Sequence, residues 1–376
     1  SAEARPRAKR RGRTAAEVAG AHVRGGGRGA EVPWERSEQG AGAPRPDGAN
    51  QGNTANQRNG NTMLSRIAES LFWIGRYVER AESTSRILDV HVHRVLEDPW
   101  LDEESAGREL LAVMGVATVV APVDSQLVTE LLGYDRTNQS SIVGAISAAR
   151  ENARSARVVV SSEVWECLNA TWNELEYTEE LASRLGPHVF FRYIRERTAM
   201  LAGLVDATLA RDDGWRFLVL GRGLERVDMT ARLLSSSISD APNSQSWVSL
   251  LRSCGAHESY LRTYRRAVDA SRVAEFLLLD RLFPRSVYWS LALAEQILAE
   301  LDSGRRLGRS TVHDAGRRAV GLARTELEFR DVAELVEDMP ELLRGLQRTC
   351  SEVSAAVTAR YFARETPRAW ATEVPA

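Results

Sequence analysis

Two segments of nearly the same sequence stand 146 positions apart, and they constrain the fold of this chain more than any other feature. They read IGRYVERAESTSRIL at 74–88 and LGRGLERVDMTARLL at 220–234. Seven of the fifteen positions are identical, and Glu82 is matched by Asp228. The shared pattern GRxxERxExTxRxL predicts two equivalent helices, which either descend from a duplication or serve the same purpose.

Each copy of this pattern is amphipathic when it is placed on an α-helix at about 100° per residue. Aliphatic side chains occupy one arc, while carboxylates and guanidinium groups lie beside each other on the other. Gly75 and Gly221 lie at the edge of the charged face, where a glycine costs about 1 kcal/mol relative to alanine. We expect close approach of a backbone or a ligand at these glycines. The helices at 66–97 and 214–236 are predicted to pack with their charged faces together, related by an approximate two-fold axis.

The charged residues allow three interpretations. In the first, Arg–carboxylate pairs hold the two copies together as a structural network. In the second, they line a polar pocket for an anionic or amide ligand. In the third they are catalytic, with Glu79 and Glu225 as the best candidates, and paired carboxylates could hold Mg²⁺ although neighbouring arginines compete for them. The candidate ligand-binding residues are Arg76, Glu79, Arg80, Glu82, Arg222, Glu225, Arg226, Asp228 and Arg285.

From Met63 onward, the spacing of apolar residues follows a helical period almost throughout. The predicted fold class is therefore all-α, a multi-helix bundle with an internal repeat of the GRxxERxExTxRxL helix. Asp124, Asn138 and Ser286 are predicted to cap helices. Helices are expected at 65–97, 124–132, 138 to about 160, 162–184, 188–210, 214–236, 245–253, 256–268, 271–283, 286–302, 310–335 and 340–363.

Residues 1–62 differ from the rest of the chain in composition. They hold eleven Lys and Arg against six Asp and Glu, and very few large apolar residues. So few apolar side chains cannot offset the entropy lost on ordering. We expect a disordered, basic, low-complexity tail, which is dispensable or an artefact of the assigned gene start, followed by one helical domain at 63–370.

Composition also excludes several classes of function. Lys9 is the sole lysine, so the predicted domain holds no P-loop or Schiff-base lysine. Cys167, Cys254 and Cys350 show no CxxC spacing, which favours a reduced, cytoplasmic protein. The chain has no apolar run long enough to span a membrane. A net charge of −2 and the scarcity of lysine argue against a nucleic-acid partner.

No metal or cofactor is predicted. His91 and His93 point to different sides of a helix and cannot share a metal there. His93 shares a stripe with Asp89 and Glu97, which we interpret as a solvated polar face. The chain has neither an HExxH nor an ExxH motif. Arg285 follows a predicted helix break and could bind an anion at the next helix N-terminus.

The segment MLSRIAESLFWIGRYVERAE at 63–82 resembles the opening of the alpha-E domain, a bacterial helical family catalogued as a domain of unknown function. The resemblance continues in the same order through 138–169, 215–234 and 247–287. It implies a helical domain whose relatives are often encoded with, or fused to, circularly permuted ATP-grasp ligases and transglutaminase-like peptidases. It implies no catalytic mechanism for the domain itself.

The leading hypothesis is therefore a cytoplasmic binding or assembly partner of an ATP-grasp ligase and a transglutaminase-like peptidase, in a pathway that makes or modifies a peptide or amide bond. Catalytic activity of its own is not expected, and a homo-oligomer is compatible with the sequence. One alternative is an enzyme with a Glu/Arg site between the two repeat helices, and a second is a purely structural scaffold. A cavity lined by Glu79, Arg80, Glu225 and Arg226 would favour a ligand site, whereas contact without a cavity would favour the scaffold.

Overall fold

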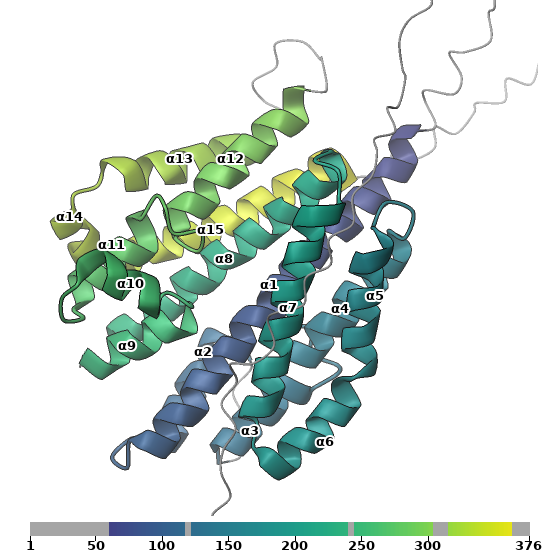
Figure 1. Cartoon of the computed structure of the whole chain (residues 1–376). Coiled ribbons are helices and arrows are strands. Elements are labelled where there is room, and N and C mark those ends of the chain that lie inside the picture. The colour runs from purple at the N-terminus through teal and green to yellow at the C-terminus, as the bar shows by residue number, and fades with distance from the viewer. Residues whose placement is uncertain (1–59, 117–121, 240–243, 304–314, 363–376) are drawn as a thin grey trace, which may run out of the picture. The chain divides into compact units, whose positions relative to one another are not determined.

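The computed structural model describes residues 60–116, 122–239, 244–303 and 315–362, all of which belong to one compact unit, Gly52–Ala376. The predicted tail therefore lies almost entirely outside the described residues. Within the described ranges every regular element is helical, which confirms the all-α class (Figure 1). No described helix combines the length and apolar character needed to cross a lipid bilayer.

The helices of the first half begin with a 38-residue helix, and those of the second half begin with one of 27 residues. The first set is α1 (Gly60–Glu97), α2 (Glu103–Val113), α3 (Ser125–Thr129), the π-helical turn η1 (Glu130–Tyr134), α4 (Ile142–Ser155), α5 (Ser162–Asn173), α6 (Leu175–Leu185) and α7 (His188–Thr208). The second set is α8 (Asp213–Ser239), α9 (Ser244–Ser253), α10 (His257–Tyr264), α11 (Ala270–Leu279), α12 (Val287–Ser303), α13 (Ala315–Phe329), α14 (Val332–Glu337), α15 (Met339–Val357) and η3 (Thr358–Phe362).

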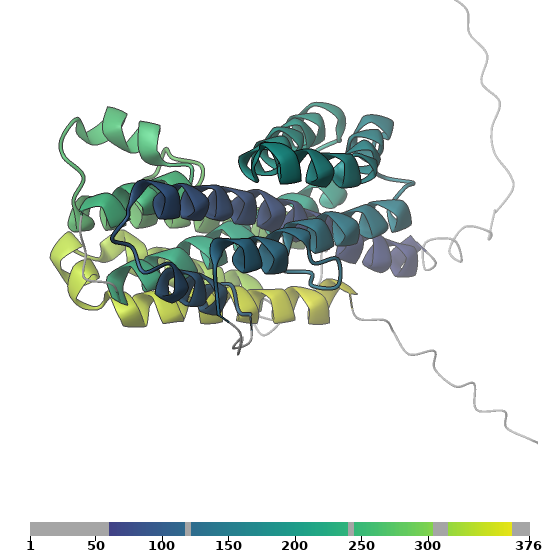
Figure 2. The same ribbon diagram turned by 90° about the horizontal axis from the view of Figure 1, so that it is seen from below.

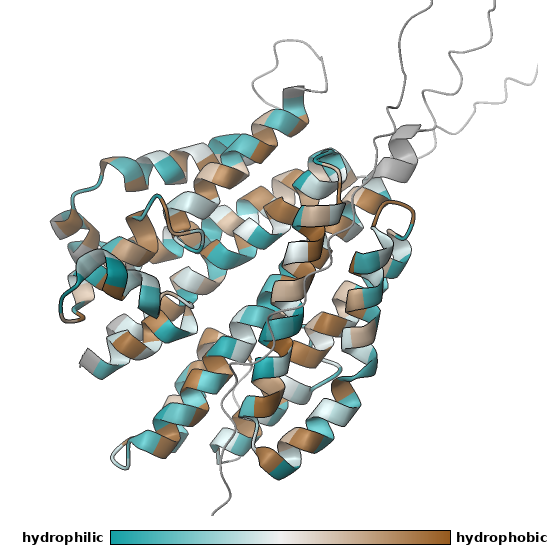
Figure 3. Ribbon diagram, in the orientation of Figure 1, coloured by the Kyte–Doolittle hydropathy of each residue, from teal (hydrophilic) through white to brown (hydrophobic). Residues whose placement is uncertain are grey.

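The two helices that carry the repeated pattern, α1 and α8, pack against each other along much of their length (Figures 1 and 2). Helices α4 and α7 pack on α1, and α5 joins them; α12 and α15 pack on α8, and α13 joins them. Each helix carries both apolar and polar residues, as the hydropathy colouring shows (Figure 3). Because α1 and α8 are covered by neighbours on several sides, side chains on their shared face are withdrawn from water. The fully buried ones include Leu71, Phe72, Ile74, Leu220 and Leu224.

Several predicted helix starts are confirmed by their capping contacts. The Asp124 side chain accepts a hydrogen bond from Leu127 N at 2.8 Å, and the Ser286 hydroxyl accepts one from Trp289 N at 3.1 Å. These side chains satisfy backbone donors that have no partner inside the helix.

Other predicted boundaries are wrong. Ser141, not Asn138, caps α4, since its hydroxyl accepts the bond from Gly144 N at 2.9 Å. The predicted helix 162–184 is two helices that meet at Glu174. The predicted helix 310–335 is α13 followed by α14, and its first residues lie outside the described ranges. Helix α2, which Asp102 caps, was not predicted.

Candidate functional site

The backbones of α1 and α8 approach each other most closely at the two repeat glycines. A Cβ atom on Gly75 would lie 2.0 Å from Leu218 O, and one on Gly221 would lie 2.1 Å from Phe72 O. Residues 75 and 72 correspond to 221 and 218 in the repeat alignment, so the two contacts are reciprocal. This confirms that a backbone approaches closely at both glycines, and the reciprocity is what an approximate two-fold axis between the helices requires.

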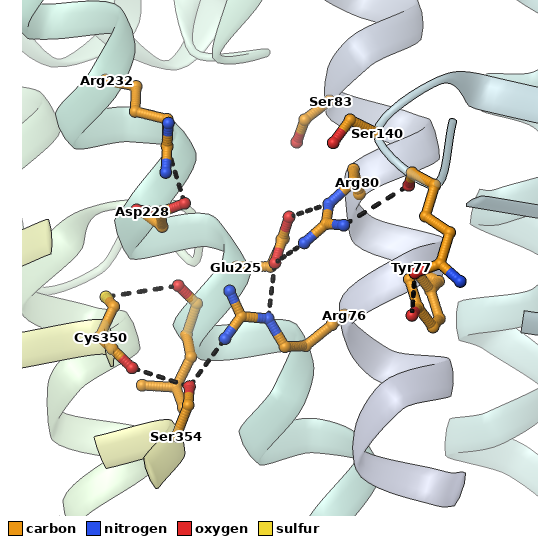
Figure 4. A network of polar contacts seen from close by, with 12 residues as sticks. Arg76, Tyr77, Arg80, Ser83, Ser140, Glu225, Asp228, Arg232, Cys350 and Ser354 are labelled. Carbon is orange, nitrogen blue, oxygen red and sulfur yellow. Dashed lines mark hydrogen bonds and ion pairs between the residues drawn. The ribbon is translucent and has the colours of Figure 1, made fainter. Parts of the chain in front are cut away.

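The charged faces of the two helices meet beside these glycines. Glu225 on α8 accepts hydrogen bonds from Arg76 Nε at 2.7 Å and from Arg80 Nε at 2.6 Å (Figure 4). Arg76 also donates to the hydroxyl of Ser354 on α15 at 2.8 Å. The Glu225 side chain is only 1% exposed. This confirms the prediction that arginines of the first repeat copy contact a carboxylate of the second copy.

The reverse contact is made by Glu79 on α1, whose side chain is also 1% exposed. Its Oε2 lies 2.9 Å from Arg226 Nε, and its Oε1 accepts a bond from Arg285 at 2.5 Å. Arg285 also donates to Glu82 at 2.8 Å, and Arg86 donates to that same carboxylate at 3.0 Å. Carboxylates of α1 therefore engage the guanidinium group that the sequence assigned to an external anion.

The corners that precede α4 and α12 add a second pair of equivalent contacts. Arg80 donates to the carbonyl of Gln139 at 3.4 Å, and Arg226 donates to that of Pro284 at 3.2 Å. In both corners a serine hydroxyl caps the helix and donates to the carbonyl of an aspartate six residues earlier. The pattern DRxxxxS, which occurs at 135–141 and again at 280–286, is the sequence signal for these corners.

The two halves of the network differ at Arg222, the counterpart of Arg76. It forms no hydrogen bond or ion pair with the described residues, and Arg285 engages Glu79 instead. Burial and the neighbouring charge of Arg226 lower the pKa of the Arg222 guanidinium from its usual value. Asp228 pairs with Arg232 on its own helix at 2.9 Å, as Glu82 does with Arg86.

The electrostatics of the network favour charged carboxylates in spite of their burial. Burial alone would raise the pKa of Glu79, but the charges of Arg226 and Arg285 outweigh it and hold that pKa below its ordinary value. In the same way, the charges of Arg76 and Arg80 hold the pKa of Glu225 below its ordinary value. Both carboxylates are therefore anions that brace buried arginines between the two helices.

A small cavity adjoins Glu79's arginine partners. This cavity of about 10 Å³ touches Arg226 and Arg285, with Ser83 and Thr230 among its other lining residues. That volume holds about one water molecule. Among the described residues, no group of three or more His, Cys, Asp or Glu side chains is placed to hold a metal ion. The arrangement is suited to holding α1 and α8 together.

The two histidines near the end of α1 differ in burial: His93 is half exposed, whereas His91 is buried. The Nδ1 of His93 lies 2.7 Å from the carbonyl oxygen of Asp89, but the Asp89 carboxylate pairs with Arg195 of α7 at 2.7 Å, so the predicted stripe is not wholly solvated. His91 is buried, lines a cavity and has no partner for its Nε2 among the described residues. The sequence interpretation assigned no role to His91, although the opposite facing of i and i+2 residues indicates that one of the two is turned inward.

Comparisons with known proteins find similar sequences in mycobacteria. Two relatives are the uncharacterised proteins Mb2597 of Mycobacterium bovis and Rv2567 of Mycobacterium tuberculosis, which are 25% and 24% identical to this chain. Each match covers 79% of this chain and 37% of the relative, so the chain spans little more than a third of their length. No solved structure gives a significant match.

The model of the Alpha-E family, described as a predicted alpha-helical domain with a conserved ER motif, matches residues 63–362. That range begins at Met63, where the helical pattern was expected to begin, and runs to the last described helical residue. Glu-Arg pairs stand at 79–80 and 225–226, where α1 and α8 meet. With most of its length matched, this chain belongs to the Alpha-E family.

Proposed function

We propose that this chain is a cytoplasmic helical partner, without catalytic activity of its own, of an ATP-grasp ligase and a transglutaminase-like peptidase that make or modify peptide or other amide bonds. The observation that carries the proposal is the engagement of Glu79 and Glu225. Each is 1% exposed and is paired with two arginines. A general acid or base has to come within hydrogen-bond distance of the reacting proton. These carboxylates would first have to exchange an arginine for the substrate.

The length of the relatives supports a role beside other domains. The matched part makes up 37% of each mycobacterial relative, so these proteins carry much additional sequence in the same polypeptide. Additional sequence in the same polypeptide is what a domain that acts together with other domains would have. In this proposal the present chain acts together with the ligase and the peptidase.

A surface suited to a protein partner lies where α13 meets the corner before α12. Leu282 and Phe329 are 89% and 81% exposed. The residues that precede them in the chain, Arg281 and Glu328, form a hydrogen bond of 3.1 Å, so the two segments lie close together. Leu322, which is 62% exposed, lies two helical turns before Phe329 on α13. Exposed apolar patches of this kind commonly mark protein interfaces. We assign the ligase contact to this apolar patch, defined by Leu282, Leu322 and Phe329.

The test is complex formation with a circularly permuted ATP-grasp ligase from the genome that encodes this chain. Light scattering after size exclusion should show a joint complex, and ATP turnover by the ligase should change when the chain is added. The double variant Leu282→Glu, Phe329→Glu should abolish both effects. Tyr177→Glu, at an exposed apolar position on α6, should leave them intact.

Two results would count against this proposal. One is the absence of any complex at micromolar concentrations, together with unchanged ATP turnover. The other is substrate conversion by the purified chain alone that disappears in Glu79→Gln or Glu225→Gln. The second result would favour the alternative of an enzyme with a Glu/Arg site.

A further inference from the structure

Two neighbouring cavities lie beside the C-terminal part of α1, and neither is lined by Glu79 or Glu225. The first, here called the serine cavity, has about 280 Å³ and lies between α1, α2, α8 and α9. The second, the arginine cavity, has about 330 Å³ and lies between α1, α7, α9 and α10. They share Val90, Arg94 and Ser249. Each is near the lower end of the size range of small-molecule sites.

The serine cavity contains a buried polar group that has no partner among the described residues. His91 is 6% exposed, and its Nε2 has no hydrogen-bond partner among the described residues. Ser249 and Ser253, which are 8% and 7% exposed, also line this cavity. Buried polar groups in proteins are nearly always hydrogen-bonded. Hydroxyls and a neutral imidazole each donate and accept, so they match a ligand group that does both.

The arginine cavity contains cations that are not engaged. Arg195 pairs with Asp89 at 2.7 Å, and Arg86 pairs with Glu82. Arg94 and Arg252 form no ion pair with a described residue. Four arginines and three carboxylates line this cavity, the carboxylates being those of Asp89, Glu97 and Glu258. The guanidinium groups of Arg94 and Arg252 suit a ligand carboxylate, which arginine binds well.

We propose that the two cavities form one binding site for a small carboxylic acid that also carries an amide, such as the carboxyl end of a short peptide or an N-acyl amino acid. The carboxylate lies at Arg94 and Arg252, and the amide lies among His91, Ser249 and Ser253. Arg94 belongs to both cavities and sets the distance between the two ends of the ligand. The site rests on these side chains alone, whereas the choice of an amide over a hydroxy acid rests on the proposed function.

The experiment is a titration of the purified full chain, labelled with ¹³C-histidine, with N-acetyl-alanyl-alanine and with N-acetylalanine. The imidazole signal of His91, assigned by its loss in His91→Asn, should shift in a saturable way with at least one of the two acids. The C-terminal amide of the same dipeptide should bind about tenfold more weakly or worse, because it lacks the charge that Arg94 pairs with. Arg94→Gln should weaken the acid by a similar factor, and Arg184→Gln on α6 should not.

Three outcomes would overturn the proposal. The first is no movement of the His91 signal with either acid at tens of millimolar. The second is equal binding of the acid and the C-terminal amide. The third is tighter binding of lactyl-lactate, in which ester and hydroxyl groups replace the amides. Because the ligase is absent from this titration, a failure here is distinguishable from a failure of the complex-formation test.

Discussion

At the scale of single residues, His91 is the titratable group whose surroundings have the clearest consequence in solution. Burial, with a smaller contribution from the charge of Arg94, lowers the pKa of the His91 imidazole to about 4. In the unfolded chain the same group has a pKa of about 6.5. The folded protein therefore holds His91 neutral at pH values where the unfolded chain has already bound a proton.

The sign of the resulting pH dependence follows from this difference. As the pH falls from about 6.5 to about 4, the unfolded state takes up a proton that the folded state refuses. The free energy of unfolding should therefore decrease over this window, by about 3 kcal/mol at its end. Urea unfolding at a series of pH values from 7.5 to 4.5 should show this slope in the parent chain and in His188→Asn. His91→Asn should lack it, and parallel profiles for all three proteins would contradict the prediction.

Some contacts of single residues could be predicted from the sequence, and others could not. The pairs Arg80–Glu225 and Arg226–Glu79 follow from the repeat alignment, because equivalent helices that pack face to face exchange equivalent contacts. Arg285 could not be assigned to Glu79 in this way, since its counterpart in the first half is Ser140 and no repeat signal points to an arginine there. Arg222 has no ion-pair partner among the described residues because Arg285, which has no equivalent in the first half, pairs with Glu79 in its place.

At the scale of the helical element, the close packing of α1 and α8 depends on two positions without a side chain. Gly75 and Gly221 each face a backbone carbonyl of the other helix at a distance that a Cβ atom cannot occupy. The free energy that a helical glycine costs is thus offset by contacts between the two backbones. The same approach brings Glu79 and Glu225 within reach of arginines from the facing helix.

Alanine at either glycine should therefore destabilise the protein in spite of its higher helix propensity. Gly75→Ala and Gly221→Ala should each lower the free energy of unfolding by about 1–3 kcal/mol or more, because the helices have to move apart. Gly203→Ala on α7 is the matched control, since a Cβ atom there meets nothing within 4 Å. It should raise the free energy by about 0.5–1 kcal/mol. Denaturant melts that rank all three variants alike would show that the close approach is not needed.

Helices with long apolar stripes were predictable, and short connecting elements were not. The extents of α1, α7 and α8 agree with their predicted ranges to within a few residues, because their periodic patterns run for many turns. Helix α2 has eleven residues and buries only Gly107 and Leu111 within its range, so its periodic signal is weak. The segment NQSS offered several capping residues, and the contact of Ser141 with the preceding corner decided between them.

At the scale of the whole molecule, α1 and α8 each carry their own set of helices, and the Glu79 and Glu225 ion pairs connect the two sets. The pKa values of both carboxylates lie below their ordinary value in the folded state. Their contribution to stability is therefore complete above the unfolded pKa, about 4.5, and is lost as the pH falls through the lower folded values. At pH 7 the network acts at full strength.

The central claim is that these carboxylates brace buried arginines, and the free energy of unfolding of Glu79→Gln and Glu225→Gln at pH 7 tests it most directly. Each substitution keeps the shape of the side chain but leaves guanidinium groups without their counter-charge, which costs about 3–5 kcal/mol at a buried pair. Glu104→Gln removes an exposed partner of Arg108 and should change the value by less than about 1 kcal/mol. Urea unfolding should place both network variants well below this control. Values for Glu79→Gln and Glu225→Gln equal to that of Glu104→Gln, or above the parent chain, would contradict the claim.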